Sequence, residues 1–247
     1  MACCPAHEDR SPSLVISLTH DGKILFFCHA GCKTPEILAA LGMRIADIME
    51  GGNVGDLRRR ELELVDVYPY EDEHGEVCYE VLRYMPKTFR QRRPDHAGGW
   101  IWNLDGVRLV PYRLPKVLAS KETLVICEGE RDVHTAELLG FVATTNNGGA
   151  CHWNDSISPH FAGKSVVVIP DNDAKGREHA YRVCGSLLAH GVGEVRLLQL
   201  PGLPEKADLT SWCRRVPGKS KSLEERRALV REALLGLIGG ALAYRAG

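Results

Sequence analysis

The stretch SVVVIPDNDAKGREHA, residues 165–180, decides how the second half of the chain is interpreted. Its apolar first part runs directly into Asp171 and Asp173, which are separated by one residue. Upstream, the apolar run LVIC ends in the same way at Glu128. In parallel α/β sheets, ligands bind beyond the carboxyl ends of the strands. If the two apolar runs are neighbouring strands, three carboxylates meet at one edge of a sheet.

The sequence around this stretch alternates between strand-like and helix-like segments. The expected strands are ETLVICEG, FVATTNNGG (a strand and a glycine turn), KSVVVIPDND and EVRLLQL, at residues 122–129, 141–149, 164–173 and 194–200. The expected helices between them are RDVHTAELLG and GREHAYRVCGSLLAHG, at residues 131–140 and 176–191. Continuous apolar strands that alternate with helices indicate a parallel sheet covered on both faces. A C-terminal amphipathic helix is expected from Ser222, in SLEERRALVREALLGLI.

The three carboxylates predict a metal site. Like charges at such short range repel, and at least one acid would have to stay protonated. A divalent cation removes this conflict, and carboxylate oxygens suit Mg²⁺ or Mn²⁺. Asp208, just past the last strand of the pattern, is a candidate for the same edge. The alternative is that these acids only make turns at strand ends; their shared position favours the metal site.

The segments CEGERDV and PDNDAKGREHA resemble a Toprim domain, the fold shared by bacterial-type primases, topoisomerases and some nucleases. The resemblance covers about residues 121–213. It implies that Glu128, Asp171 and Asp173 are catalytic and hold Mg²⁺ or Mn²⁺, with Asp208 in a later acidic motif. Asp132 stands where primases of this family carry an aspartate. In such a site, metal activates a 3′-hydroxyl and stabilises charge on the transferred phosphorus.

The first 32 residues carry a separate pattern of metal ligands. Two close pairs, Cys-x2-His and Cys-x3-Cys, flank SLVISLTHDGKILFFC, which predicts a hairpin turning at Asp21-Gly22. Tetrahedral zinc takes four N or S ligands in such pairs. The candidate ligands are Cys4, His7, Cys28 and Cys32. Cys3 is an alternative to Cys4, and His29 is an alternative within CHAGC.

This segment resembles the zinc ribbon of bacterial and phage primases, which opens with Cys-Pro-x-His, continues through Arg-Ser-Pro-Ser and closes with two cysteines. The resemblance favours Cys4 over Cys3 and implies a structural zinc ion. The closing pair here is Cys-x3-Cys, where Cys-x2-Cys is usual; the variant is associated with phage and mobile-element primases. A helix is expected from Thr34, with Thr34 as N-cap, Pro35 at the first position and Gly42 at the end.

The middle of the chain is basic and strand-like. Lys87, Arg90, Arg92 and Arg93 fall within seven residues, beside Phe89, Trp100 and Trp102. Cations can neutralise template phosphates, and aromatic faces can stack on bases. The other candidate contacts to nucleic acid or nucleotide are Tyr112, Arg113, Lys175 and Arg177. The alternative is a solvated basic loop with the tryptophans in the core.

We therefore expect a mixture of α+β and α/β structure: a small zinc-ribbon β module, a mainly-β middle module, and a Toprim Rossmann-like parallel sheet flanked by helices. Strand-like segments in the middle module are ELELVDVYPYED, EVCYEVLRYM and GGWIWNLDGVRLVPYRL, at 61–72, 76–85 and 98–114. The expected divisions are 1–50 (zinc ribbon with a helix), 51–60 (linker), 61–118 (basic module), 119–215 (Toprim) and 216–247 (C-terminal helical segment).

The composition limits the class of protein. A net charge of −1 excludes a globally basic nucleic-acid binder, though not a local basic patch. No apolar run is long enough for a membrane span, and the first residues do not form a secretory signal. Beyond the N-terminal cluster, the cysteines are scattered singly, as in a reducing cytosol. We expect a cytoplasmic protein.

Zinc ribbon followed by Toprim is the order found in primases. The resemblance implies a DNA primase of phage, prophage or plasmid type, which binds single-stranded DNA and joins nucleoside triphosphates into RNA primers. The chain has no Gly-x4-Gly-Lys-Ser/Thr motif, so any helicase would be a separate partner. Two alternatives remain open: a Toprim nuclease, which typically lacks a zinc ribbon, and a non-catalytic zinc-dependent module that binds single strands.

Overall fold

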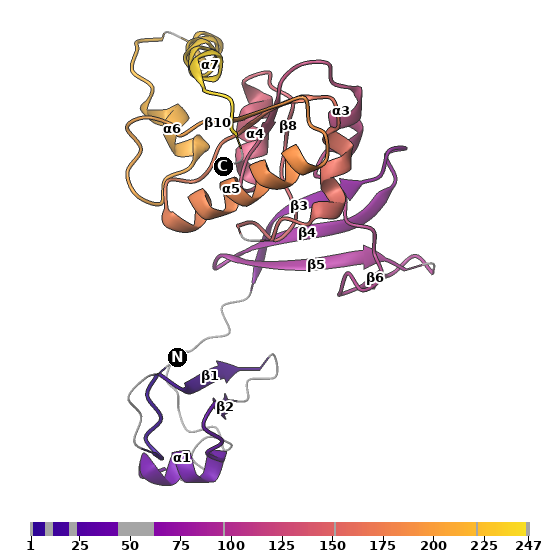
Figure 1. Ribbon diagram of the computed structural model, residues 1–247. Coiled ribbons are helices and arrows are strands. Elements are labelled where there is room, and N and C mark those ends of the chain that lie inside the picture. Colours follow the sequence, from indigo (N-terminus) through magenta and orange to yellow (C-terminus); the bar gives the residue numbers. More distant parts are fainter. Residues whose placement is uncertain are drawn as a thin grey trace. The chain divides into compact units, whose positions relative to one another are not determined.

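The computed structural model describes residues 2–7, 12–19, 24–43, 62–95, 97–150, 152–220 and 222–245. They belong to two compact units, Met1–Glu61 and Leu62–Gly247, each described by itself (Figure 1). In these described ranges, no helix has the length and apolar character needed to cross a lipid bilayer.

The first unit is a hairpin followed by a short helix. Strands β1 (Leu14–Leu18) and β2 (Ile24–Cys28) pair antiparallel, as expected; the turn at Asp21-Gly22 lies outside the described residues. Helix α1 spans Thr34–Ala40. It starts one residue earlier than expected, because Lys33 rather than Thr34 is the N-cap, and the Lys33 backbone N–H donates to the Glu36 carboxylate at 2.8 Å. Gly42 ends the helix with φ +70°.

An antiparallel sheet opens the second unit. Its strands, in spatial order, are β3 (Glu63–Glu71), β4 (Val77–Met85), β5 (Thr88–Pro94) and β6 (Trp100–Ile101). The first two confirm the predicted strands, while β5 lies in the stretch identified only as basic. The predicted strand over residues 98–114 is largely wrong. Only β6 pairs, and α3 (Leu114–Ala119) follows, with Pro115 in its first turn, where a missing N–H costs nothing.

The parallel sheet has the four predicted strands, each shorter than expected. They are β7 (Leu124–Ile126), β8 (Ala143–Thr144), β9 (Ser165–Val168) and β10 (Glu194–Leu197). The spatial order is β10-β9-β7-β8, and every neighbouring pair is parallel. Strands β7 and β9 are therefore neighbours, which is the condition for the acidic cluster.

Helices cover both faces of this sheet. They are α4 (Glu130–Leu138), η1 (a 3₁₀ helix, Asp155–Phe161), α5 (Ala174–Ala189), α6 (Leu209–Arg215) and α7 (Leu223–Gly240). Successive strand residues point to opposite faces. Val125 and Val167 pack in one core with residues of α4, α6 and α7, and Leu124 and Val166 pack in another with residues of α3, η1 and α5. Figure 1 shows these layers.

The antiparallel and parallel sheets share a core. Tyr70 and Tyr79 of the antiparallel sheet stack with ring centroids 4.6 Å apart and belong to the same buried cluster as Val125 and Leu234. The Tyr70 hydroxyl donates to Glu130 Oε1 at 2.8 Å. Residues 62–247 therefore pack as one unit, and their expected division into three functional parts stays a prediction.

Candidate functional site

The predicted acidic residues follow adjacent strands. Ile126 of β7 is paired with Val168 of β9, so Glu128 and Asp171 leave the sheet at the same edge. Glu128 Oε2 is buried and has no hydrogen-bond partner. Gly176 lies close by, because a Cβ there would be 2.8 Å from this oxygen. A buried carboxylate oxygen without a donor is costly unless a cation faces it.

The electrostatics of the cluster fit a cation. Burial, together with the negative charges of Glu128 and Asp132, raises the pKa of Asp171 to about 8. Burial also raises the pKa of Glu128, and the charge of Asp173 adds to this effect. A divalent cation would let these acids ionise together. The hard oxygen donors suit Mg²⁺ or Mn²⁺, with Glu128 and Asp171 as the residues that would hold the ion.

Asp173 and Asp208 have other partners as well. Asp173 is the N-cap of α5 and accepts from the Gly176 backbone N–H at 2.8 Å through Oδ1. Asp208 caps α6 through Oδ1, 2.7 Å from the Ser211 backbone nitrogen, and its Oδ2 pairs with Arg131. Both oxygens of Asp208 are therefore engaged. The metal-binding roles of Glu128, Asp171, Asp173 and Asp208 all stay predictions.

A cleft of about 370 Å³ lies against the acidic cluster. Its acidic wall includes Glu128, Asp132, Asp171 and Asp208. The cleft is also lined from β4, β5 and the turn between them, by Arg83, Lys87, Phe89 and Gln91. The positive charge of Lys87 opposes the rise in the pKa of Glu128, so the turn carries its charge near the carboxylates. The cleft can hold a molecule that contacts both cations and metal-binding acids.

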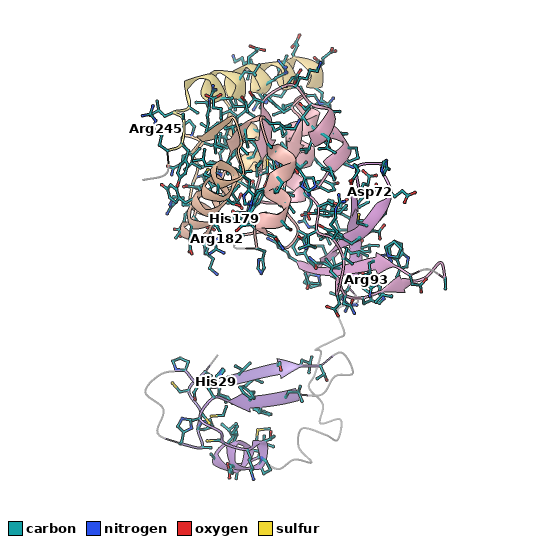
Figure 2. The ribbon with its side chains drawn as sticks, turned by 45° about the vertical axis from the view of Figure 1, so that its right-hand side comes forward. His29, Asp72, Arg93, His179, Arg182 and Arg245 are labelled. Carbon is teal, nitrogen blue, oxygen red and sulfur yellow. The ribbon has the colours of Figure 1, made fainter. Side chains whose placement is uncertain are left out.

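The structure divides the predicted basic cluster. Alternate residues of β5 point to opposite faces of the sheet, and Phe89 and Gln91 line the cleft. Arg90 and Arg92 therefore point away from it. Arg92 forms an ion pair with Glu80 at 2.6 Å and lies 3.9 Å from the centroid of the Trp100 ring, while Arg93, labelled in Figure 2, bonds Asn103 at 3.4 Å. Of the four predicted cations, Lys87 lines the cleft.

The remaining predicted contacts lie outside the cleft lining. Tyr112 is buried, and its hydroxyl lies 2.9 Å from His134 Nε2. Arg113 lies over the Tyr112 ring and forms an ion pair with Glu137 at 3.5 Å. These contacts favour a structural role, in which the two residues join the antiparallel sheet to α4. Lys175 and Arg177 are in the first turn of α5, directly after Asp173.

The prediction missed several cleft residues. Arg83 and Glu130 line the cleft, and the Arg83 Nε is buried with no hydrogen-bond partner. The period of two along β4 places Arg83 on the same face as Val81, which also lines the cleft. The glycine turn at Gly148-Gly149 also lines the cleft. This turn follows β8 as Glu128 follows β7. Because ligands bind beyond the carboxyl ends of parallel strands, its position could have identified it as part of the site.

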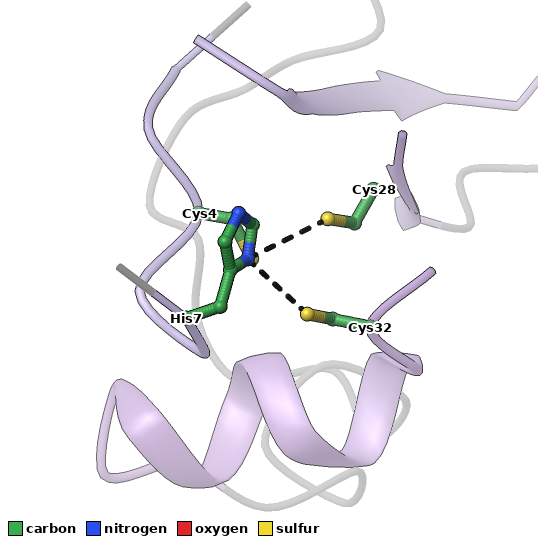
Figure 3. Close-up of side chains that lie close together, drawn as sticks. All are labelled: Cys4, His7, Cys28 and Cys32. Atoms are coloured by element: carbon green, nitrogen blue, oxygen red, sulfur yellow. Dashed lines mark hydrogen bonds between the residues drawn. The ribbon is translucent and has the colours of Figure 1, made fainter. Parts of the chain in front are cut away.

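The first unit brings its four predicted ligands together (Figure 3). One donor atom from each of Cys4, His7, Cys28 and Cys32 lies within 4.8 Å of the others. His7 Nδ1 is 3.3 Å from the Cys32 sulfur and 3.9 Å from the Cys28 sulfur. Around a tetrahedral zinc, these ligand bond lengths give separations of about 3.5–3.8 Å. The cluster therefore fits zinc.

The two alternative ligands, Cys3 and His29, have other surroundings. Cys3 is exposed, while Cys4 is buried. His29 packs edge-on against the Phe27 ring at 5.0 Å. Burial raises the pKa of Cys32, and the neighbouring Cys28 and Cys4 sulfurs raise it further. Crowded thiolates repel as carboxylates do, so a zinc ion that faces all of them would stabilise the ionised ligands.

We expect Gly176→Ala to weaken metal binding in the cleft about tenfold, because overpacking costs roughly 1–3 kcal/mol. The new Cβ would lie 2.6 Å from the Asp171 carbonyl oxygen and 2.8 Å from Glu128 Oε2. Gly185→Ala is the matched control, since it lies in the same helix with nothing within 4 Å of the new Cβ. Mn²⁺ titration with the zinc site loaded measures the effect. Equal Mn²⁺ affinities in Gly176→Ala and Gly185→Ala would contradict the close packing of Gly176 against Asp171 and Glu128.

The chain matches solved primase structures, although no family model and no curated protein matches it. The zinc-binding and RNA polymerase domains of the Aquifex aeolicus primase match with a TM-score of 0.53 and 19% identity, over 72% of this chain and 40% of that one. A DNA primase domain from Pseudomonas aeruginosa matches with a TM-score of 0.51 and 21% identity, over 72% and 51%. A DnaG primase catalytic domain bound to single-stranded DNA matches with a TM-score of 0.50 and 20% identity, over 72% and 53%.

These matches confirm the expected fold class. The chain has the fold of a primase core, and it spans about half or less of the length of these structures. The zinc ribbon, the mainly-β sheet and the parallel Toprim-like sheet are each present.

Proposed function

We propose that the protein is a DNA primase that synthesises short RNA primers on single-stranded DNA by metal-dependent nucleotidyl transfer, in the replication of a phage, prophage or plasmid. The observation that carries the proposal is the cleft, which is lined by the carboxylates of Glu128 and Asp171 together with the cations of Arg83 and Lys87. The likeness in fold to primase cores, one of them bound to single-stranded DNA, supports it.

The residues of the cleft have complementary tasks in this reaction. Bound Mg²⁺ or Mn²⁺ supplies charge neutralisation at the reacting phosphate and lowers the pKa of the attacking hydroxyl. Glu128 and Asp171, with Asp173 at the start of α5, would hold the ion. Arg83 and Lys87 would bind the phosphate chain. Phe89, which is 46% exposed, offers a ring face on which a base can stack.

The zinc unit would contribute to binding of the template. Its hairpin exposes the Phe27 ring beside His29, and aromatic faces bind bases in single strands. Zinc would have a structural role there, through Cys4, His7, Cys28 and Cys32. Nucleoside triphosphates and single-stranded DNA are the proposed substrates, and a replicative helicase would be a separate partner.

A primer-synthesis assay tests the proposal. Purified protein is incubated with single-stranded DNA of mixed sequence, labelled nucleoside triphosphates, and Mg²⁺ or Mn²⁺. Short labelled oligomers are the expected product. Shortened template without oligomers would identify a nuclease instead. DNA binding with neither product would favour the non-catalytic module.

We expect Arg83→Gln and Lys87→Ala each to raise the KM for nucleoside triphosphates about tenfold, because each removes a charge-assisted phosphate contact of roughly 1.5–3 kcal/mol. Template affinity should change much less. Arg108→Ala is the control, since Arg108 pairs with Glu73 on the surface and does not line the cleft. Steady-state kinetics with varied triphosphate measure the effect. An unchanged KM in both variants would place the phosphates elsewhere.

A further inference from the structure

A second hollow, called here the side groove, joins the acidic cleft. It has a volume of about 490 Å³. Gln91 of β5 and Gly148, in the turn after β8, line both the side groove and the cleft. The two hollows therefore meet at these residues. Asn147, His152 and Trp153 continue the lining of the side groove away from the carboxylates.

The chemistry of the side groove differs from that of the cleft. Among the residues that the structure describes, no lysine or arginine lines it, so it is poorly suited to a phosphate. Leu109 and Trp153 contribute apolar atoms to it, Gln91 and Asn147 contribute neutral amides, and His152 contributes an imidazole ring. Amide groups beside apolar side chains are suited to a nucleobase, whose edge pairs with the amides of Asn and Gln.

Two of these amides are available for a ligand. Within the described residues, no hydrogen bond engages the side-chain amide of Gln91 or Asn147. The other polar side chains of the side groove are used by the protein. Asn154 Oδ1 accepts from the Ser156 backbone N–H at 2.9 Å, Asp155 accepts from Ser186 at 2.5 Å, and His152 Nδ1 lies 2.8 Å from the Ala150 carbonyl oxygen.

The wall that carries Asn147 is held in place by the protein. The buried Asn146 donates through Nδ2 to the carbonyl oxygens of Asn147, at 2.9 Å, and Gly149, at 3.1 Å. Gly148 has φ +85°, and a Cβ there would be 3.2 Å from His152 Cβ. On the far side, Trp153 Nε1 donates to Ser158 Oγ at 3.0 Å. A wall fixed in this way binds without a large ordering cost.

We infer that the side groove binds a nucleobase, with Gln91 and Asn147 as the hydrogen-bond partners of its edge, while phosphates of the same strand or nucleotide lie in the acidic cleft. The inference rests on the proposed function and adds a base-binding subsite to it. The base can belong to a nucleoside triphosphate or to the DNA template, and the two sources require different measurements.

The first measurement compares nucleotides with their phosphate chain. With Mg²⁺ present, the affinities of ATP, GTP, CTP and UTP are compared with that of inorganic tripolyphosphate. The second measurement compares a single-stranded oligodeoxynucleotide with an abasic strand of equal length. In at least one of the two comparisons, we expect the ligand with bases to bind about tenfold more tightly. Gln91→Ala/Asn147→Ala should remove that difference and leave the affinity for tripolyphosphate unchanged.

Gln199→Ala, an exposed amide outside the side groove, is the matched control and should keep the difference. If the double variant does not fold, His152→Ala, an exposed residue of the side groove, replaces it. Equal affinities for ligands with and without bases would overturn this inference and leave the proposed function intact. An affinity difference that persists in Gln91→Ala/Asn147→Ala would do the same. Failure of the wild-type protein to bind any triphosphate or DNA would overturn the proposed function, and this inference with it.

Discussion

Replacing Asp171 and Asp173 together with alanine should reduce primer synthesis at least about a thousandfold, because the metal contributes several kcal/mol to transition-state stabilisation and each 1.36 kcal/mol is a factor of ten. The variant keeps Glu128 but loses the carboxylates that follow β9. Labelled oligomers should disappear with Mg²⁺ and with Mn²⁺. The measurement is the initial rate of oligomer formation on single-stranded DNA. A residual rate above a tenth of the wild-type rate would exclude these residues as the main ligands.

The control for this variant is Glu178→Ala, an exposed residue of α5, the helix that Asp173 caps. It removes a negative charge near Asp173 without touching the cleft, so primer synthesis should stay within twofold or so of the wild-type rate. DNA binding should persist in both variants. If the control loses activity as well, the effect belongs to α5 and not to the carboxylates.

Stability measurements separate loss of metal from loss of fold. The folded-state pKa of Asp171 is raised from 3.8 to about 8. Between these values the folded protein keeps a proton that the unfolded chain has released, so without divalent metal its stability falls as the pH rises from about 4 to 8. The double variant lacks this acid and should show a smaller fall. It loses the N-cap of α5, which costs about 1 kcal/mol, and it should no longer gain thermal stability from Mn²⁺.

In the part of the chain where strand-like and helix-like segments alternate, the sequence was enough to predict the fold. Continuous apolar runs that alternate with helix-like segments identified the strands of the parallel sheet. Because the carboxyl ends of parallel strands lie at one edge of the sheet, Glu128 and Asp171 were expected there together. The order of the strands was not available from the pattern. It depends on which helices cover which face, and that is set by packing between residues far apart in the chain.

The predictions of a strand over residues 98–114 and of a single basic cluster failed, because each local sequence is compatible with two structures. Residues 98–114 are aromatic and β-branched enough to predict a strand, but Arg113 takes a left-handed conformation with φ +62° and α3 starts at the next residue. Arg92 and Lys87 looked equivalent in the sequence, but Lys87 lies in the turn before β5 and lines the cleft, whereas the pleat of β5 points Arg92 away from it. Arg83 was missed because a single arginine in an apolar strand gives no signal until the strand has a register and a cleft.

Zinc is expected to be necessary for the fold of the first unit, and Cys28→Ser should remove both the metal and the fold. The described hydrophobic cluster of this unit consists of the buried residues Cys4, Leu14, Cys28 and Ile37, two of which are predicted ligands, and Leu38 is buried as well. So small a core cannot offset the entropy of ordering the chain. A structural zinc site contributes about 10–16 kcal/mol, so its loss decides the equilibrium.

Cys3→Ser is the matched control, since Cys3 is exposed and adjacent to the ligand Cys4. Zinc content should fall from one ion per chain to none in Cys28→Ser and stay at one in Cys3→Ser. Proton–nitrogen correlation spectra should lose the dispersed signals of residues 12–43 in Cys28→Ser, while those of residues 62–245 persist, because the two units have separate cores. Stoichiometric zinc in Cys28→Ser, or equal loss in Cys3→Ser, would contradict the ligand set. Since the proposed cleft lies wholly in the second unit, the zinc-free protein should still bind nucleoside triphosphates with Mg²⁺ and should bind single-stranded DNA more weakly.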